Sequence, residues 1–182
     1  MKNNYQSPWL EEALKNEVDI KINKLEKKID TDICIIGGGY TGLWTALKIK
    51  EKSPNTKIII IERDICGSGA SGRNGGCMLP LSPKFPAMKK TVGYRNAIQM
   101  VKATEEALFK IRDFCEENNI DAQIRIDGGV YTATNKAHSG SFENLIKELE
   151  TYNLNSWKRL SIEKVQKITG SKKNIDGYFS PL

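Results

Sequence analysis

Residues 31–63 read TDICIIGGGYTGLWTALKIKEKSPNTKIIIIER, and this stretch decides the fold. Two short runs rich in β-branched residues, 31–36 and 57–61, enclose a glycine turn and a segment, 39–50, in which apolar residues recur every three to four positions. That spacing predicts a helix, which a proline then ends. The order strand, glycine turn, helix, strand is a βαβ unit. The continuous apolar run of the second strand is typical of a parallel sheet that is covered on both faces.

The glycine turn GGGYTG, residues 37–42, fits the dinucleotide pattern GxGxxG. It stands where the pattern requires, directly after a strand and directly before a helix. In this pattern Gly37 permits the tight turn, Gly39 lets a pyrophosphate approach the backbone, and Gly42 lets the helix pack close to the strand. The sequence therefore predicts a dinucleotide-binding fingerprint here.

Two further features of the βαβ unit support this prediction. The helix start, with Tyr40 and Thr41 as its first residues, offers unpaired N–H groups and the positive end of the helix dipole to phosphates. Glu62 ends the second strand, twenty residues after Gly42, where a carboxylate accepts hydrogen bonds from ribose hydroxyls. Such a carboxylate argues against a ligand with a 2′-phosphate, although Arg63 beside it weakens that argument.

A second stretch, ICGSGASGRNGGC at residues 65–77, contains another GxGxxG match at 67–72. No strand directly precedes it and no helix is expected after it, so we interpret the match as a coincidence of glycine density. A loop that leaves the carboxyl end of the second strand nevertheless lies beside the same crevice. Its glycines permit positive φ, and Arg73 and Asn74 add polar groups that suit an anion or a ring edge. A flexible surface loop is the alternative, and spacing alone does not decide between the two.

The run DICIIGGGYTGLWTALKIKEKSPNTKIIIIERDICGSGASGRNGGCML, residues 32–79, resembles the N-terminal FAD-binding region of the D-amino-acid oxidase/glycine oxidase superfamily. The flanking SPWLEEAL and KFPAM segments are similar to the branch that includes gamma-glutamylputrescine oxidase. The resemblance favours FAD over NAD, and it implies that the second loop wraps the flavin side of FAD. The implied contacts in this loop are Gly69, Ala70, Ser71, Arg73, Asn74, Gly75 and Gly76.

The resemblance also implies a function. The expected activity is oxidation of an amine or amino-acid C–N bond by hydride transfer to flavin, with a small amine or amino acid as the substrate. No catalytic residue is named, because the usual substrate-side residues would lie beyond Leu182. Two alternatives stay open: an NAD-dependent dehydrogenase, and a non-catalytic fragment or split subunit that works only with a chain supplying the C-terminal half.

We expect three parts in the chain: a lead with a short helix (1–30), the FAD-binding βαβ unit with the flavin loop (31–80), and a partial α+β substrate or cap domain (81–182). The fold class is thus α/β, Rossmann-like at first, and incomplete because a doubly wound domain needs more parallel strands. The elements expected outside the βαβ unit are a helix at SPWLEEAL capped by Ser7, a proline-punctuated connection at SPKFPAMKK, a helix at 94–118, a hairpin at 123–134 around Asp127-Gly128-Gly129, a helix at 142–152, a strand at 157–160, a helix at 161–168 capped by Ser161, and an extended end at 178–179.

Composition excludes several other classes of function. The net charge of +6 comes with interleaved Lys and Glu, and no nucleic-acid-binding module accompanies it. The four cysteines have no CxxC spacing and the one histidine, His138, lies in a polar run, so no metal site is expected. We expect Cys34 and Cys115 to be small buried hydrophobes. No run is long and apolar enough to span a bilayer, which favours a cytoplasmic protein without a membrane span.

Overall fold

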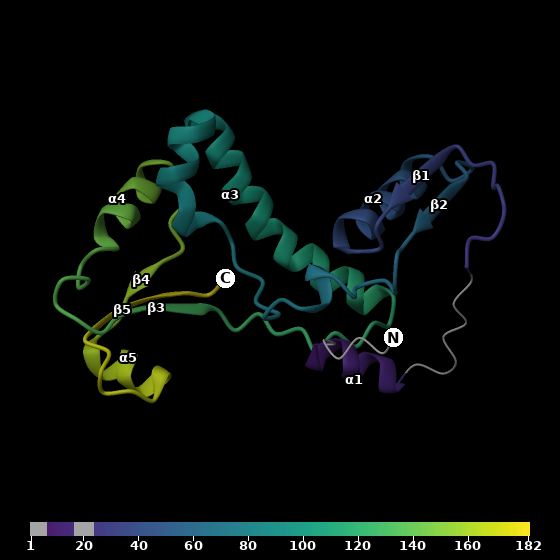
Figure 1. Cartoon of the computed structure of the whole chain (residues 1–182). Helices are drawn as coiled ribbons and strands as arrows, with labels where there is room; N and C mark the ends of the chain where they lie inside the picture. Colours follow the sequence, from purple (N-terminus) through teal and green to yellow (C-terminus); the bar gives the residue numbers. More distant parts are fainter. Residues whose placement is uncertain (1–6, 17–23) are drawn as a thin grey trace. The chain divides into compact units, whose positions relative to one another are not determined.

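The structure is a computed structural model that describes residues 7–16 and 24–182. The chain divides into two compact units, residues 1–77 and 78–182, and each is described by itself. Figure 1 shows the helices and strands of both units. Within the described ranges, no helix is both long and apolar enough to cross a membrane.

The first unit begins with α1 (Pro8–Asn16). Ser7 caps this helix, because its Oγ atom accepts the backbone N–H of Leu10 at 3.1 Å and its carbonyl accepts that of Glu11 at 2.9 Å. The capped helix predicted at SPWLEEAL is confirmed. The rest of the expected lead includes residues 1–6 and 17–23, which lie outside the described residues.

The predicted βαβ unit is confirmed. Strand β1 (Ile33–Ile36) is followed by α2 (Tyr40–Lys52) and β2 (Ile58–Ile61). The two strands are parallel and pair in register from Ile33↔Ile58 to Ile36↔Ile61. Side chains tie the strand starts together, since Asp32 accepts the N–H of Lys57 at 2.8 Å and Thr31 donates to the carbonyl of Lys57 at 2.7 Å.

The sheet of the first unit has two strands. The apolar run of β2 predicts cover on both faces of the sheet, but its residues are only partly shielded from solvent. Along β1, Ile33 and Ile35 are half-buried, whereas Cys34 is exposed and Ile36 is 89% exposed. The expectation that Cys34 is buried is therefore wrong. Cys34 and Ile36 lie on the same face of β1, and no described segment covers that face. Cys115, in the second unit, is half-buried.

The second unit contains a three-stranded antiparallel sheet in the order β3-β5-β4. The strands are β3 (Gly129–Ala133), β4 (Lys158–Arg159) and β5 (Asp176–Ser180). Its helices are the one-turn η2 (Ser82–Lys84), α3 (Phe85–Glu117), α4 (Glu143–Thr151) and α5 (Ile162–Thr169). The predictions for α4, β4, the capped α5 and the extended end are confirmed with small changes of bounds.

The long helix α3 starts earlier than the sequence predicts. Gly93 interrupts it with φ 79° and ψ 160°, so the predicted helix from residue 94 corresponds to its second section. The first section, residues 85–92, occupies a stretch that we expected to be a connection. That expectation was wrong because Pro83 and Pro86 stand at the starts of η2 and α3, where the missing proline N–H leaves no helical bond unmade.

The hairpin predicted at residues 123–134 is also wrong. Residues 121–128 form no strand, and β3 begins only after Gly128, which has φ 84°. The partner of β3 is β5, with Gly129 opposite Ser180. The alternating pattern identified a strand but not its partner, which lies far along the chain.

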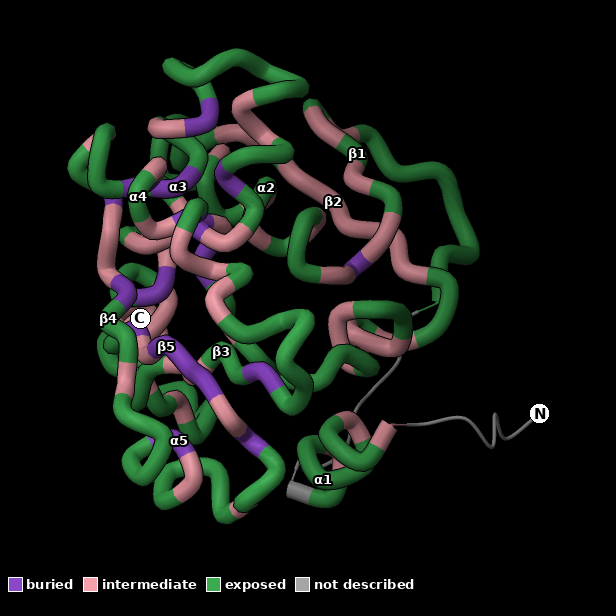
Figure 2. The backbone as a smooth tube through the Cα atoms, turned by 90° about the vertical axis from the view of Figure 1, so that its left-hand side faces the viewer, coloured by how far each residue is buried: buried purple, intermediate pink, exposed green. Residues whose placement is uncertain are grey.

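Burial differs sharply between the two units (Figure 2). The second unit has a core cluster of buried residues, which consists of Phe85, Ala97, Val101, Leu145, Leu149, Leu154, Trp157 and Tyr178. In the described part of the first unit, Gly38 alone is buried. The first unit therefore holds its βαβ geometry without a closed core of its own.

Candidate cofactor site

The glycine turn between β1 and α2 has the backbone that the fingerprint requires. Gly37 has φ 103°, a conformation that side chains rarely adopt. Gly39 is the N-cap of α2. A Cβ atom at Gly42 would collide with the carbonyl oxygen of Gly37 and would lie 3.3 Å from Cγ2 of Ile35. The close packing of helix against strand, predicted for Gly42, is confirmed.

Glu62, at the end of β2, is bonded to this turn. Its Oε2 atom accepts the backbone N–H of Gly38 at 2.7 Å, and its Oε1 atom accepts that of Asp64 at 3.1 Å. The hydrogen bond from Gly38, followed by that from Asp64, lowers the pKa of the carboxyl group, with a smaller contribution from the charge of Arg63. Glu62 is thus ionised at neutral pH, and each oxygen keeps lone pairs for a further donor.

The start of α2 is capped from a distant segment. Gly39 has no side chain to offer, and the Oγ atom of Ser71 accepts the N–H of Tyr40 at 2.9 Å. Thr41 and Gly42 follow in the first turn, where an α-helix leaves its N–H groups without helical partners. These two amides remain for an anion, for which the described residues supply no acceptor.

The second GxGxxG match, residues 67–72, forms a turn like the first. Its first glycine, Gly67, has φ 84°, its third-position glycine is the N-cap of η1 (Ala70–Gly72), and a Cβ atom at Gly72 would collide with the carbonyl oxygen of Gly67. The expectation that no strand directly precedes this match and that no helix follows it is confirmed, because β2 ends at Ile61 and η1 lasts a single turn. The match is thus no second βαβ fingerprint, although its glycines form a similar turn.

Asn74 shapes the rest of this second loop. Its Nδ2 atom donates to the carbonyls of Ser71 at 2.8 Å and Ala70 at 3.4 Å, while its Oδ1 atom accepts the N–H of Gly76 at 2.8 Å. These bonds fold the chain back after η1 and prevent the helix from continuing. The neighbouring Arg73 is exposed, and its guanidinium has no hydrogen bond or ion pair within the described ranges. A direct contact of Asn74 or Arg73 with flavin stays a prediction.

Gly38 and Cys66 join the two loops, and neither was predicted as a cofactor-site residue. A Cβ atom at Gly38 would collide with the sulfur of Cys66, and the carbonyl of Gly38 accepts the N–H of Gly67 at 3.0 Å. The signal was present in the sequence, because the run of three glycines contains one more than GxGxxG needs. The structure thus brings Gly37, Gly39, Tyr40, Thr41, Gly42, Glu62 and the loop 67–76 together in one unit, with Arg63 exposed beside Glu62.

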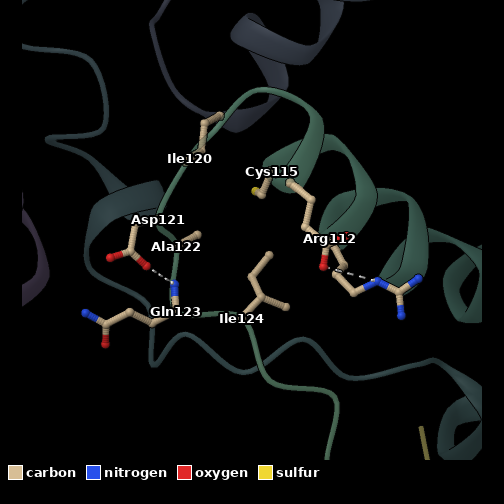
Figure 3. A pocket seen from close by; sticks show the side chains of 8 residues that line it. Arg112, Cys115, Ile120, Asp121, Ala122, Gln123 and Ile124 are labelled. Atoms are coloured by element: carbon tan, nitrogen blue, oxygen red, sulfur yellow. Dashed lines mark hydrogen bonds and ion pairs between the residues drawn. The ribbon is translucent and has the colours of Figure 1, made fainter.

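Two surface hollows lie elsewhere. One, of about 260 Å³, follows the end of α3 in the second unit (Figure 3). Its lining is mixed, with apolar residues such as Ile120 and Ile124 and polar residues such as Asp121, and the lining residue Arg112 is paired with Asp113. The other, of about 380 Å³, lies along α2 beside Trp44. Neither is lined by a residue of the glycine turns.

Comparison with known proteins decides between the dinucleotides. Residues 32–182 match the family described as FAD dependent oxidoreductase. The chain belongs to this family. Its cofactor is accordingly FAD, and the parallel βαβ unit agrees with the Rossmann-like α/β fold of the family. The nicotinamide alternative has no support.

Individual relatives agree with this assignment. The chain is 32% identical to gamma-glutamylputrescine oxidoreductase of Escherichia coli over 129 residues, which are 70% of this chain and 30% of that protein. It is 29% identical to L-2-hydroxyglutarate dehydrogenase of Indibacter alkaliphilus over 120 residues, 65% of this chain and 27% of that one. A probable oxidoreductase of Haemophilus influenzae is 41% identical over 58 residues, 32% of this chain and 13% of that one. The chain thus spans less than a third of these relatives.

Proposed function

We propose that this chain contributes the FAD-binding part of an enzyme that oxidises the C–N bond of an amine or amino acid. The observation that supports a shared flavin site most strongly is the junction of the two glycine loops through Ser71 and Tyr40, since it holds the loop expected to bind the flavin end beside the turn expected to bind the adenosine end. The amine class rests on the relative named for gamma-glutamylputrescine. The relative named for a hydroxy acid makes C–O oxidation the competing class.

In this proposal the first turn holds the adenosine end of FAD. The amides of Thr41 and Gly42 donate to the pyrophosphate, and the dipole of the thirteen-residue α2 favours the negative charge there. The ionised Glu62 accepts from the ribose hydroxyls, while its bond to Gly38 fixes the carboxylate in place. These residues are complementary in charge and in hydrogen-bonding capacity to an adenosine diphosphate.

The second loop, residues 67–76, holds the flavin end. Ser71 lies at the start of α2, so its hydroxyl can also reach the pyrophosphate, and Arg73 supplies an uncommitted positive charge. When bound, FAD accepts the two electrons and the hydrogen that leave the substrate carbon. The chain's own part is to bind and orient the cofactor. We assign no general acid or base among its residues.

The second unit is proposed as the start of the α+β substrate domain. Its antiparallel sheet and its buried core show a unit that packs independently of further parallel strands. We also propose that further polypeptide of the same enzyme, in the same or a separate chain, covers the first unit. Ile36 is 89%, Tyr40 60% and Leu47 40% exposed, and such apolar area is costly to leave in water.

Anaerobic flavin reduction tests the proposed function. The complete enzyme, including the further polypeptide proposed above, is purified with FAD and mixed in turn with polyamines, amino acids and 2-hydroxy acids while the visible absorbance of the flavin is followed. Bleaching by members of the amine or amino-acid sets, and not by hydroxy acids, is the expected result. Bleaching by hydroxy acids alone would show that the enzyme oxidises C–O bonds instead. Bound FAD that none of the three substrate sets reduces would contradict the proposed function.

A further inference from the structure

The second glycine loop is held at its two ends by different elements. Near its start, Gly67 donates to the carbonyl of Gly38 at 3.0 Å, and Ser71 accepts from Tyr40 at 2.9 Å. These bonds attach the loop to the first turn. From residue 72 onward the loop makes no further hydrogen bond to the first turn within the described residues. The side chain of Asn74 bonds to other residues of the loop.

Helix α1 supplies the bonds at the far end. The hydroxyl of Ser7 donates to the carbonyl of Gly72 while accepting the N–H of Leu10, so both its hydrogen-bonding functions are used. The indole N–H of Trp9 donates to the carbonyl of Asn74 at 3.1 Å. Leu10 also lies close to the loop, because a Cβ atom added at Gly72 would lie 3.9 Å from the Cβ atom of Leu10.

We propose that α1 is a clamp on the loop 72–76, and that Ser7 and Trp9 are positioning residues for the flavin end of FAD. This inference rests on the proposed function. The clamp acts on main-chain carbonyls, so it fixes the path of the loop without contacting the cofactor. The first turn, which holds the adenosine end, receives no bond from α1 within the described residues. Loss of the clamp therefore weakens binding of FAD and leaves binding of ADP unchanged.

The test uses variants that keep α1 intact. Trp9→Phe keeps an aromatic ring, though a smaller one, and removes the indole N–H. Ser7→Asp keeps an acceptor for the N–H of Leu10, because Asp is a good N-cap, but it has no donor for Gly72. Ser7→Thr retains both functions and serves as the rescue variant. Glu12→Ala, at an exposed position of α1 whose side chain makes no hydrogen bond or ion pair within the described residues, is the matched control.

Two readouts are measured on the full chain: the Kd values for FAD and for ADP, by titration, and the hydrogen exchange of the amides of residues 72–76 without ligand. The clamp predicts that Trp9→Phe and Ser7→Asp each raise the Kd for FAD by about three- to tenfold, as the loss of one hydrogen bond does. It also predicts an unchanged Kd for ADP and faster exchange in the loop, with Ser7→Thr and Glu12→Ala like the wild type.

The outcomes separate the clamp from the proposed function. Equal weakening of FAD and ADP would show a general loss of folding and overturn the clamp, as would unchanged FAD affinity with unchanged loop exchange. A wild-type chain that binds neither ligand would contradict the proposed function. In that event the exchange rates still decide whether α1 restrains the loop.

Discussion

The backbone N–H of Tyr40 donates to the Oγ atom of Ser71 at 2.9 Å, so a side chain of the second glycine loop caps the helix that the first glycine turn opens. The bond connects residues 31 positions apart. It makes the start of α2 a shared feature of both loops, and the account of the cofactor site depends on it.

Replacing Ser71 tests this connection. Ser71→Ala leaves the N–H of Tyr40 without its acceptor, and loss of a helix cap costs about 0.5–2 kcal/mol. We expect faster amide exchange in the first turn of α2 and weaker binding of both FAD and ADP. Ser71→Thr keeps the hydroxyl and should restore both. Identical exchange rates in Ser71→Ala and the wild type would show that the cap contributes nothing.

Close packing at Gly42 gives a second prediction. In Gly42→Ala the added methyl would collide with the backbone carbonyl of Gly37, and overpacking of this kind costs about 1–3 kcal/mol. We expect the variant to lose affinity for ADP together with order in α2, as seen by amide exchange. Gly129→Ala is the control, because a Cβ atom there meets nothing within 4 Å. An ADP affinity of Gly42→Ala equal to that of the control would refute the packing role.

The lowered pKa of Glu62 predicts how ADP binding responds to acid. An ordinary glutamate begins to lose its charge near its pKa of about 4.3. Because hydrogen bonds from Gly38 and Asp64 lower the pKa of Glu62, its carboxylate stays ionised as the pH falls from about 7 to about 5. Glu62→Gln should weaken ADP binding, and because protonation of the ADP phosphate affects both proteins alike, the ratio of the two affinities should be constant over that interval. A ratio that falls toward one between about pH 7 and about pH 5 would contradict the assignment.

Asp176 predicts the acid stability of the second unit. Its side chain is 4% exposed and accepts from the N–H of Gly140 at 2.7 Å and from Nε of Arg159 at 3.2 Å. Burial alone raises the pKa of this carboxyl group, but the bond from Gly140 and the charge of Arg159 outweigh it and lower the pKa. The resulting stability is present above the unfolded-state pKa of about 3.9 and is lost as the pH falls through the lower folded-state value.

Urea unfolding of wild type and Asp176→Asn, followed by the fluorescence of the buried Trp157, measures this contribution. At neutral pH the variant should be less stable by about 1–3 kcal/mol, since bonds to a buried charged group are weakened. The difference should shrink below about pH 4. A difference that is constant down to the acid limit would exclude the carboxylate as its source.

The βαβ unit could be predicted from sequence because each of its signals is local. The glycines that set the turn, the apolar run of β2 and the acid at its end all lie within about thirty residues. The same holds for caps, as Ser7 and Ser161 show, because a cap acts on the next three residues. Here the local preferences and the final structure agree.

The wrong predictions of the hairpin and of the burial of Cys34 have a common physical origin. Both features depend on segments that lie far away in the sequence. The partner of β3 is β5, so an alternating pattern could not reveal that Asp127-Gly128 is no hairpin turn. The exposure of Cys34 depends on what covers the second face of β1. The similarity of the turn at residues 67–72 to the first turn was not predicted, because no strand or longer helix flanks it and its glycine spacing alone sets the backbone.

Amide chemical shifts during an FAD titration of the isotope-labelled chain test whether the two glycine loops form one FAD site, because they also detect weak binding. We expect the amides of Thr41 and Gly42 and those of residues 69–76 to shift together, along one saturation curve. ADP should shift the first group and leave the flavin end of the loop, residues 72–76, nearly unchanged. Shifts from FAD that are confined to the first turn, or that saturate separately in the two loops, would contradict a single site.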